Sequence, residues 1–177
     1  MIEIAVYGRK GQGVFSASKC LAKAFDFQGI NSVVFPSFES WMVGSPVTCF
    51  VRASRKVIET KSPIILADYS LVLDSSLIVS EKVVEKTKAR GTIIVNTAKE
   101  LEISREHRVI CVDINQGAKD FFPKSVNIGL LGAYAGATRI LQLKNLVSSI
   151  SELFPEDFDK NSRIAEKIYE LVRRELT

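Results

Sequence analysis

The amino-acid sequence predicts an α/β fold in three layers: a largely parallel, doubly wound (Rossmann-like) sheet with an extra antiparallel strand or hairpin, and C-terminal helices. Three observations predict it. Short apolar or β-branched runs alternate with helix-like segments, which is the pattern of parallel sheets. A glycine-rich turn at 8–13 joins the first run to the first helix-like segment. With 177 residues, 46% of them apolar, the chain has the size and composition of a single domain, 1–177.

The run 2–7 is apolar enough to be a central strand. Strands are predicted where apolar or β-branched residues run together, at 2–7, 30–35, 47–53, 64–67, 69–73, 92–95 and 108–112, with 56–60 as a partner of the strand before it. Helices are predicted where apolar residues recur at helical spacing, at 16–27, 79–87, 116–122, 128–138, 143–154 and 161–176.

The segment 128–138 carries small residues at near-helical spacing, among them Gly129, Gly132 and Gly136. Each glycine inside a helix costs roughly 1 kcal/mol relative to alanine. We therefore expect this helix to pack very closely against the sheet, another helix or another chain. A homodimer of the isolated chain is a separate expectation.

Composition excludes several function classes. The net charge of +4 gives no reason to expect a nucleic-acid partner. No apolar run approaches the ~18–20 residues that cross a bilayer, and the first residues lack the features of a secretory signal. We expect a soluble, cytoplasmic protein without membrane contact. Cys20, Cys49 and Cys111 are far apart and His107 is the single histidine, which argues against a metal or iron–sulfur site in this chain.

The turn after the first strand has the features of an anion site. Its glycines allow positive φ and leave no Cβ in the way of a ligand. The helix that follows points its N-terminus at the turn, and two basic residues add positive charge. We expect a phosphate or a similar anion to bind at this turn, which consists of Gly8, Arg9, Lys10, Gly11, Gln12 and Gly13.

Two other interpretations of the turn stay open. The dinucleotide motif is G-x-G-x-x-G with a carboxylate about 20 residues later. Here the glycines run G-x-x-G-x-G, and the segment 32–36 contains no acid. A stand-alone enzyme that binds NAD or FAD is therefore disfavoured. The other interpretation is a tight strand-to-helix connection that binds nothing.

In an open parallel sheet, ligands bind beyond the carboxyl ends of the strands. The residues expected there, which together would line one crevice, are Gly8–Gly13, Pro36–Ser45, Asp74–Ser76, Asn96, Thr97 and Asp113. They supply amides, hydroxyls and two carboxylates but few catalytic bases. Because aspartate caps helices well, Asp74 and Asp113 are expected to be cap or turn residues, and no catalytic residue is predicted. The chain looks like a binding domain that forms one wall of a larger site.

Several motifs, in the same order and over nearly the whole chain, resemble the gamma subunit of 2-oxoacid:ferredoxin oxidoreductases, of which the pyruvate:ferredoxin enzyme is the best-known member. The opening block is Glu3-Ile4 followed by Gly8-Arg9-Lys10-Gly11-Gln12-Gly13. The later blocks that resemble the family are 35–38, 44–47, 50–52, 94–97, 127–133, 154 and 161–169.

The resemblance implies a subunit of a complex that converts a 2-oxoacid and coenzyme A into acyl-CoA, carbon dioxide and reduced ferredoxin. It implies alpha, beta and delta subunits as partners, with thiamine diphosphate and iron–sulfur clusters held by those partners, and ferredoxin reached through the complex. The gamma chain itself would hold no metal, have no turnover alone and help to bind coenzyme A. The residues that would contact coenzyme A are Gly8, Arg9, Lys10, Gly11, Gln12, Gly13, Phe38, Trp41, Gly44, Ser45, Asn96 and Thr97.

One loop departs from the family. Members usually carry arginine ahead of the Ala-Pro-Val sequence, whereas here residues 40–44 read Ser-Trp-Met-Val-Gly. A guanidinium is the natural bidentate partner of a phosphate, so its absence favours a structural subunit without a ligand as an alternative. In place of the arginine, Trp41 and Met42 would cover an adenine ring or an acyl group, or, as we prefer, pack against a neighbouring subunit. The sequence does not identify the 2-oxoacid.

Overall fold

The computed structural model describes residues 1–38, 42–60, 62–119 and 125–176. One six-stranded sheet has the spatial order β2-β3-β1-β4-β5-β6. Its strands are β1 (Ile2–Arg9), β2 (Asn31–Phe38), β3 (Pro46–Ser54), β4 (Ala67–Val72), β5 (Thr87–Asn96) and β6 (Arg108–Val112). The helices are α1 (Val14–Phe27), α2 (Leu77–Ser80), α3 (Ile114–Ala118), α4 (Val126–Thr138), α5 (Leu143–Leu153) and α6 (Phe158–Glu175).

The sheet is mostly parallel. Strands β1, β4, β5 and β6 pair in parallel, while β3 runs antiparallel to both of its neighbours, β1 and β2. In β1, Ile4 and Val6 face one core cluster, and Ala5 and Tyr7 face the other. All four are buried, as expected for a central strand. The α/β fold class with an added antiparallel hairpin is thus confirmed.

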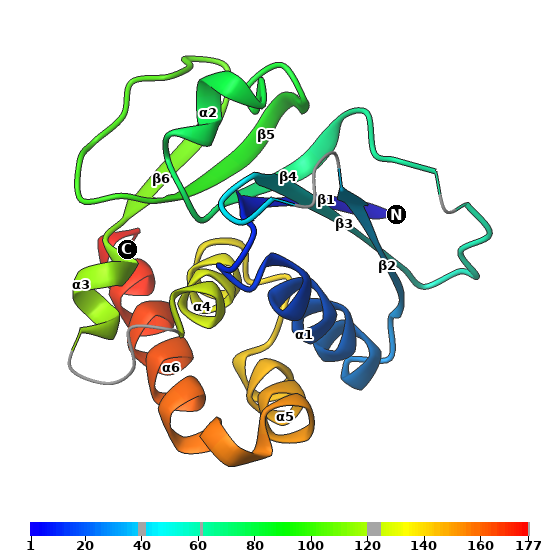
Figure 1. Ribbon diagram of the computed structural model, residues 1–177. Coiled ribbons are helices and arrows are strands. Elements are labelled where there is room, and N and C mark those ends of the chain that lie inside the picture. Colours follow the sequence, from blue (N-terminus) through cyan, green and yellow to red (C-terminus); the bar gives the residue numbers. More distant parts are fainter. Residues whose placement is uncertain (39–41, 61, 120–124, 177) are drawn as a thin grey trace.

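The two faces of the sheet are covered unequally. Helices α1, α4, α5 and α6 lie on one face, whereas α2 and the segments around it lie over the other (Figure 1). The helix expected at 79–87 was wrong beyond Ser80, because the chain turns at Lys82 with a φ of 52°. The strand expected at 56–60 was also wrong. β3 is paired with β2 on one side and with β1 on the other, so it has no free edge at which a strand from 56–60 could pair.

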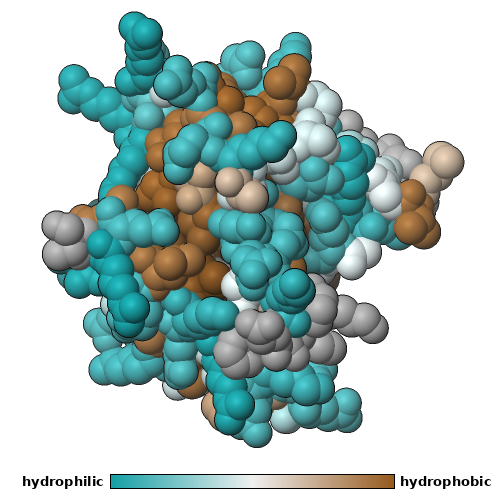
Figure 2. Space-filling view, turned by 90° about the vertical axis from the view of Figure 1, so that its left-hand side faces the viewer, coloured by the Kyte–Doolittle hydropathy of each residue, from teal (hydrophilic) through white to brown (hydrophobic). Residues whose placement is uncertain are grey.

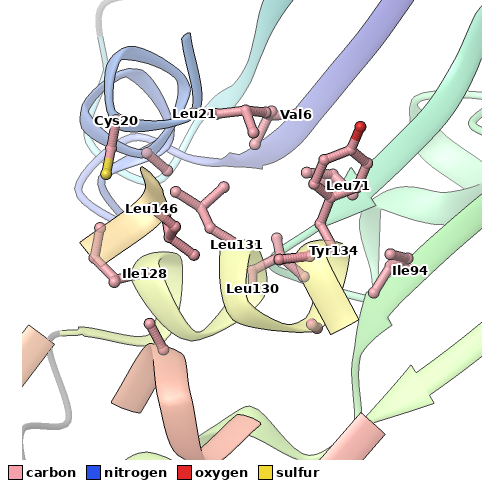
Figure 3. Packing of buried hydrophobic residues seen from close by; sticks show 14 of the residues in the cluster. Val6, Cys20, Leu21, Leu71, Ile94, Ile128, Leu130, Leu131, Tyr134 and Leu146 are labelled. Carbon is pink, nitrogen blue, oxygen red and sulfur yellow. The ribbon is translucent and has the colours of Figure 1, made fainter. Parts of the chain in front are cut away.

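The glycine-rich segment forms α4, which lies between the sheet and α6. A Cβ on Gly132 would overlap the carbonyl oxygen of Ala165, and one on Gly136 would lie 2.8 Å from the carbonyl oxygen of Tyr169. The predicted close packing is therefore against another helix. On its opposite side, α4 directs Leu131 and Tyr134 toward the strands (Figure 3).

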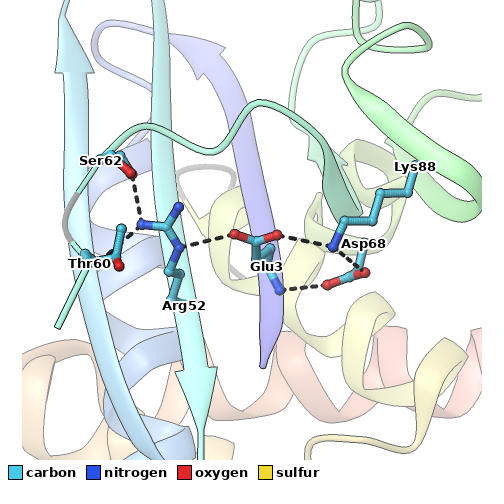
Figure 4. A network of polar contacts seen from close by, with 6 residues as sticks. All are labelled: Glu3, Arg52, Thr60, Ser62, Asp68 and Lys88. Atoms are coloured by element: carbon cyan, nitrogen blue, oxygen red, sulfur yellow. Dashed lines mark hydrogen bonds and ion pairs between the residues drawn. The ribbon is translucent and has the colours of Figure 1, made fainter. Parts of the chain in front are cut away.

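Four charged side chains form a network at the amino ends of the parallel strands (Figure 4). The Glu3 carboxylate in β1 accepts hydrogen bonds from Arg52 Nε at 3.1 Å and from Lys88 Nζ at 3.0 Å. Lys88 also pairs with Asp68 Oδ1 at 2.9 Å, and Asp68 Oδ2 accepts from the Glu3 backbone N–H at 2.8 Å. This network joins four neighbouring strands at the edge opposite the glycine turn.

The face that carries β6, α3 and α6 gathers apolar side chains in its middle, with hydrophilic residues around them (Figure 2). A hollow of about 770 Å³ lies there between α3 and α6, and Ile168 and Leu171 contribute to its lining. In the parts of the chain described above, no helix combines the length and the apolarity needed to cross a bilayer.

Candidate binding site at the carboxyl edge of the sheet

The turn from Gly8 to Gly13, called the glycine loop below, connects β1 to α1 and lies at the carboxyl edge of the sheet. Gly11 and Gly13 have φ values of 102° and 75°, which favour glycine. The loop closes on itself, because Gln12 N donates to Arg9 O at 2.9 Å and Arg9 N donates to Gln12 Oε1 at 2.7 Å. Gly11 is exposed. The sequence prediction of a left-handed glycine turn between strand and helix is confirmed.

Helix α1 begins at the end of this loop with Gly13 as its N-cap. No side chain caps it and no acidic residue lies in its first turn. The positive end of the helix dipole therefore faces the loop without an internal counter-charge. Asn127 in α4 donates from Nδ2 to the Gly13 carbonyl oxygen at 3.1 Å. The position of the loop is thus fixed by a residue 114 positions away in the sequence.

Arg9 links three loops at this edge. Its Nε donates to Asp74 Oδ2 at 2.7 Å, Nη1 to the Gly44 carbonyl oxygen at 3.0 Å and Nη2 to Ser76 Oγ at 2.8 Å. The guanidinium therefore holds the glycine loop, the β2–β3 loop and the β4–α2 loop together. From the sequence we expected Arg9 to offer its positive charge to a ligand, whereas its guanidinium is bonded to these loops.

Asp74 is the acceptor in this link. Burial alone would raise the pKa of its carboxyl group, but hydrogen bonds from Ser76 and Arg9 outweigh burial and lower the pKa below its usual value. Its Oδ1 accepts from Ser76 N at 3.0 Å and from Ser76 Oγ at 2.6 Å. Asp74 is therefore a turn residue, as expected. Asp113 caps α3 by accepting from Gln116 N, also as expected.

The β2–β3 loop lies directly against the glycine loop. Lys10 N donates to the Ser45 carbonyl oxygen at 2.9 Å, and Gly44 N donates to the Lys10 carbonyl oxygen at 3.4 Å. Beside them Met42 is 76% exposed. Trp41 lies outside the described residues, and Phe38 is placed only through its backbone at the end of β2. The structure therefore brings Gly44 and Ser45 to the site and leaves the role of Trp41 a prediction.

Two hollows flank the glycine loop, and Gly11 lines both. The first, called the polar cleft below, measures about 650 Å³ and is lined by Gly11, Gln12, Leu73, Asp74, Ser75, Asn96, Asn115 and Val126. The second, called the outer hollow, measures about 300 Å³ and is lined by Arg9, Lys10, Gly11, Gly13, Val14, Phe15, Ser16 and Val47. The polar cleft lies beyond the carboxyl ends of β1, β4 and β5, where ligands of open parallel sheets bind.

The two hollows differ in charge. Among the described residues that line the polar cleft, Asp74 carries a charge and none is basic. Arg9 and Lys10 line the outer hollow, which also contains the first residues of α1, and no described residue of its lining is acidic. An anion is therefore favoured in the outer hollow and disfavoured in the polar cleft.

Asn96 and Thr97 have structural partners. Asn96 is buried, donates from Nδ2 to the Leu73 carbonyl oxygen at 3.1 Å and accepts at Oδ1 from Ile114 N at 3.0 Å. It thereby forms the floor of the polar cleft. Thr97 N donates to the Val112 carbonyl oxygen at 2.9 Å, and Thr97 does not line the cleft.

The predicted crevice is therefore partly assembled. The glycine loop, Asp74, Ser75 and Asn96 do meet, whereas Asp113 faces the hollow between α3 and α6. Asn115 and Val126 as lining residues, and Asn127 as the anchor of Gly13, were not predicted from the sequence. The signal for Asn127 was available, because it opens one of the blocks that resemble the gamma subunits. Asn115 gave no signal, because it lies within a predicted strand-to-helix connection.

Other candidate groups have local roles. His107 Nδ1 lies 2.6 Å from Ser104 Oγ, and its Nε2 lies 3.1 Å from the Thr87 carbonyl oxygen, so both ring nitrogens have partners. Burial raises the pKa of the Cys20 thiol to about 12, against a hydrogen bond with Ser149 that lowers it. Within the ranges described, no three His, Cys, Asp or Glu side chains come together as metal ligands.

Comparisons with known proteins identify the family of this chain. The family model of pyruvate ferredoxin/flavodoxin oxidoreductase matches residues 3–171. The common gamma subunit of pyruvate/ketoisovalerate oxidoreductases from Pyrococcus furiosus is 34% identical over 178 aligned positions, which cover 96% of each chain. The crystal structure of pyruvate oxidoreductase subunit PORC from Thermotoga maritima has a TM-score of 0.80 at 29% identity, covering 96% of this chain and 95% of that one.

A solved 2-oxoglutarate:ferredoxin oxidoreductase from Magnetococcus marinus, with 2-oxoglutarate, coenzyme A and succinyl-CoA bound, shares the fold with a TM-score of 0.85. The identity is 20%, and the match covers 99% of this chain and 31% of that one. The family model spans most of the chain, and the Pyrococcus subunit matches it end to end. This chain therefore belongs to the pyruvate ferredoxin/flavodoxin oxidoreductase family, as a PorC or gamma-type subunit.

Proposed function

We propose that this chain binds coenzyme A at the glycine loop and presents it to a 2-oxoacid:ferredoxin oxidoreductase complex. As a gamma-type member of the family, it is a subunit of an oxidoreductase that acts on the oxo group of a 2-oxoacid, with an iron–sulfur protein as acceptor. Pyruvate is the proposed substrate, because the similar proteins are named for it.

One observation carries the coenzyme A proposal. The uncapped N-terminus of α1, Gly11 and Lys10 converge on the outer hollow, which has no acid among its described lining residues. Phosphates bind at such helix ends because backbone N–H groups and the helix dipole point at them. The solved 2-oxoglutarate enzyme, which shares this fold, contains coenzyme A and supports the same assignment.

The proposed partners are alpha, beta and delta subunits, with ferredoxin as the electron acceptor of the complex. Thiamine diphosphate and iron–sulfur clusters would be held by those partners, and this chain would bring coenzyme A to them without turnover of its own. The predicted cytoplasmic location is part of this proposal.

The test compares two glycines at the two ends of α1. Gly13 and Gly29 both have φ values of 75°, so alanine strains the backbone at either position. Gly13→Ala also places its Cβ against Asn127, whereas a Cβ on Gly29 meets nothing within 4 Å. Left-handed backbone costs an alanine about 1–2 kcal/mol. Gly13→Ala would relieve this strain by moving the glycine loop out of the conformation that binds the ligand, so we expect roughly a tenfold loss of coenzyme A affinity in the assembled complex.

Isothermal titration calorimetry of the purified complex measures the affinity, and Gly29→Ala should bind coenzyme A like the unmodified complex. Gly11→Ala, whose Cβ would meet no atom within 4 Å, is a second loop variant for the case that Gly13→Ala does not assemble. Unchanged affinity in both loop variants would leave the chain as a structural subunit without a ligand.

A further inference from the structure

The polar cleft on the inner side of the glycine loop has no basic residue among its described lining residues. Its volume of about 650 Å³ is that of a small-molecule site. The lining residue with a charge is Asp74, whose carboxylate stays ionised at neutral pH because its pKa is lowered. Its nearest cation, Arg9, is already bonded to it at 2.7 Å. A phosphate or a 2-oxoacid carboxylate placed here would meet a negative charge without a described basic residue in the lining.

The remaining groups of the cleft suit an uncharged polar ligand. Gln12 and Asn115 are exposed and carry side-chain amides, and Ser75 is half-buried and carries a hydroxyl. Amides and hydroxyls both donate and accept hydrogen bonds, so they match a ligand that contains the same groups. Leu73 and Val126 add apolar surface between them.

We propose that the polar cleft receives the uncharged pantetheine arm of coenzyme A, while the phosphates remain on the other side of the glycine loop. This inference rests on the proposed function. The pantetheine arm contains two amides and a hydroxyl and no charge, and all negative charge of coenzyme A is on its nucleotide half. Because Gly11 lines both hollows and has no Cβ, it is the point over which the ligand would pass from one to the other.

The test uses two neighbouring residues of α3 in the assembled complex. Asn115→Leu removes the hydrogen-bonding amide from the polar cleft at nearly constant size. Gln116→Leu is the matched control, because Gln116 is also exposed but lines the hollow between α3 and α6. Two probes are titrated by calorimetry: coenzyme A, and adenosine 3′,5′-bisphosphate, which contains the adenosine and two of the three phosphates of coenzyme A without pantetheine.

For Asn115→Leu we expect coenzyme A affinity to fall about fivefold to tenfold, the effect of about one lost hydrogen bond, and the affinity for the bisphosphate to stay unchanged. Gln116→Leu should change neither affinity. Unchanged coenzyme A binding by Asn115→Leu, or an equal loss for both probes, would overturn the inference while leaving the proposed function in place. If the unmodified complex bound neither probe, the proposed function would fail and this inference with it.

Discussion

Two arginines, each bonded to three groups, lie at opposite edges of the same sheet. Arg52 at the amino edge is 5% exposed in its side chain and bonds to Glu3 and to the carbonyl oxygens of Thr60 and Ser62. Arg9 at the carboxyl edge is 37% exposed and bonds to three groups in two neighbouring loops, which it joins to the glycine loop at the candidate site. Both guanidinium groups make charge-assisted hydrogen bonds. Because Arg52 is buried, its bonds contribute mainly to the stability of the sheet. Because Arg9 is partly exposed to solvent, its bonds contribute little to stability and mainly fix the geometry of the loops.

The largest expected effect is at the amino edge. Arg52→Met leaves the Glu3 carboxylate, 18% exposed, with Lys88 as its remaining cation, and leaves the Thr60 and Ser62 carbonyls without their donor. Removing one partner of a buried ion pair costs about 3–5 kcal/mol. Urea unfolding should show this loss, whereas Arg55→Met, an exposed arginine just after β3, should change the free energy of unfolding by about 0.5 kcal/mol or less.

At the carboxyl edge, the same substitution should separate stability from binding. Arg9→Met breaks an ion pair whose side chains are 37% and 25% exposed, so the free energy of unfolding should fall by about 1 kcal/mol or less. Coenzyme A affinity of the complex should fall as well, because the three loops lose their common link. A loss of stability as large as that of Arg52→Met, with unchanged affinity, would contradict the comparison.

The smallest effect is a pH dependence confined to the carboxyl edge. The pKa of Asp74 is lower in the folded chain than its ordinary value of 3.8, so its ionised form stabilises the fold above that value. The contribution is lost as the pH falls through the folded pKa, below about pH 4. Urea unfolding between about pH 6 and pH 3 should therefore show a steeper loss for the unmodified chain than for Asp74→Asn. Equal slopes would mean that the hydrogen bonds of Asp74 with Ser76 and Arg9 add nothing to stability.

Much of the fold follows from local patterns. The apolar run of β1, the glycine turn and the amphipathic spacing of α5 and α6 each determine one element by themselves. The hairpin could be predicted only in part, because the placement of β3 between β2 and β1 depends on contacts between distant segments. The short α2 was overestimated because a helical pattern of apolar residues continues past the turn at Lys82.

The candidate site was predictable to a smaller degree. Glycines and strand ends identified the loop and the edge of the sheet, since backbone conformation dictates these residues locally. The bond from Asn127 to Gly13 and the three bonds of Arg9 depend on residues that are 35 or more positions apart. No local spacing rule reveals such partners. The division into a basic and a cation-free hollow therefore required the folded arrangement.

The tight contact between α4 and α6 connects the glycine loop to the far end of the chain. The glycine strip of α4 packs against the backbone of α6 at Ala165 and Tyr169. Asn127, near the start of α4, takes its final position only when that helix is seated. The proposed phosphate site at the beginning of the chain thus depends, through Asn127, on a helix that packs against the eighteen residues of α6 near the end of the chain.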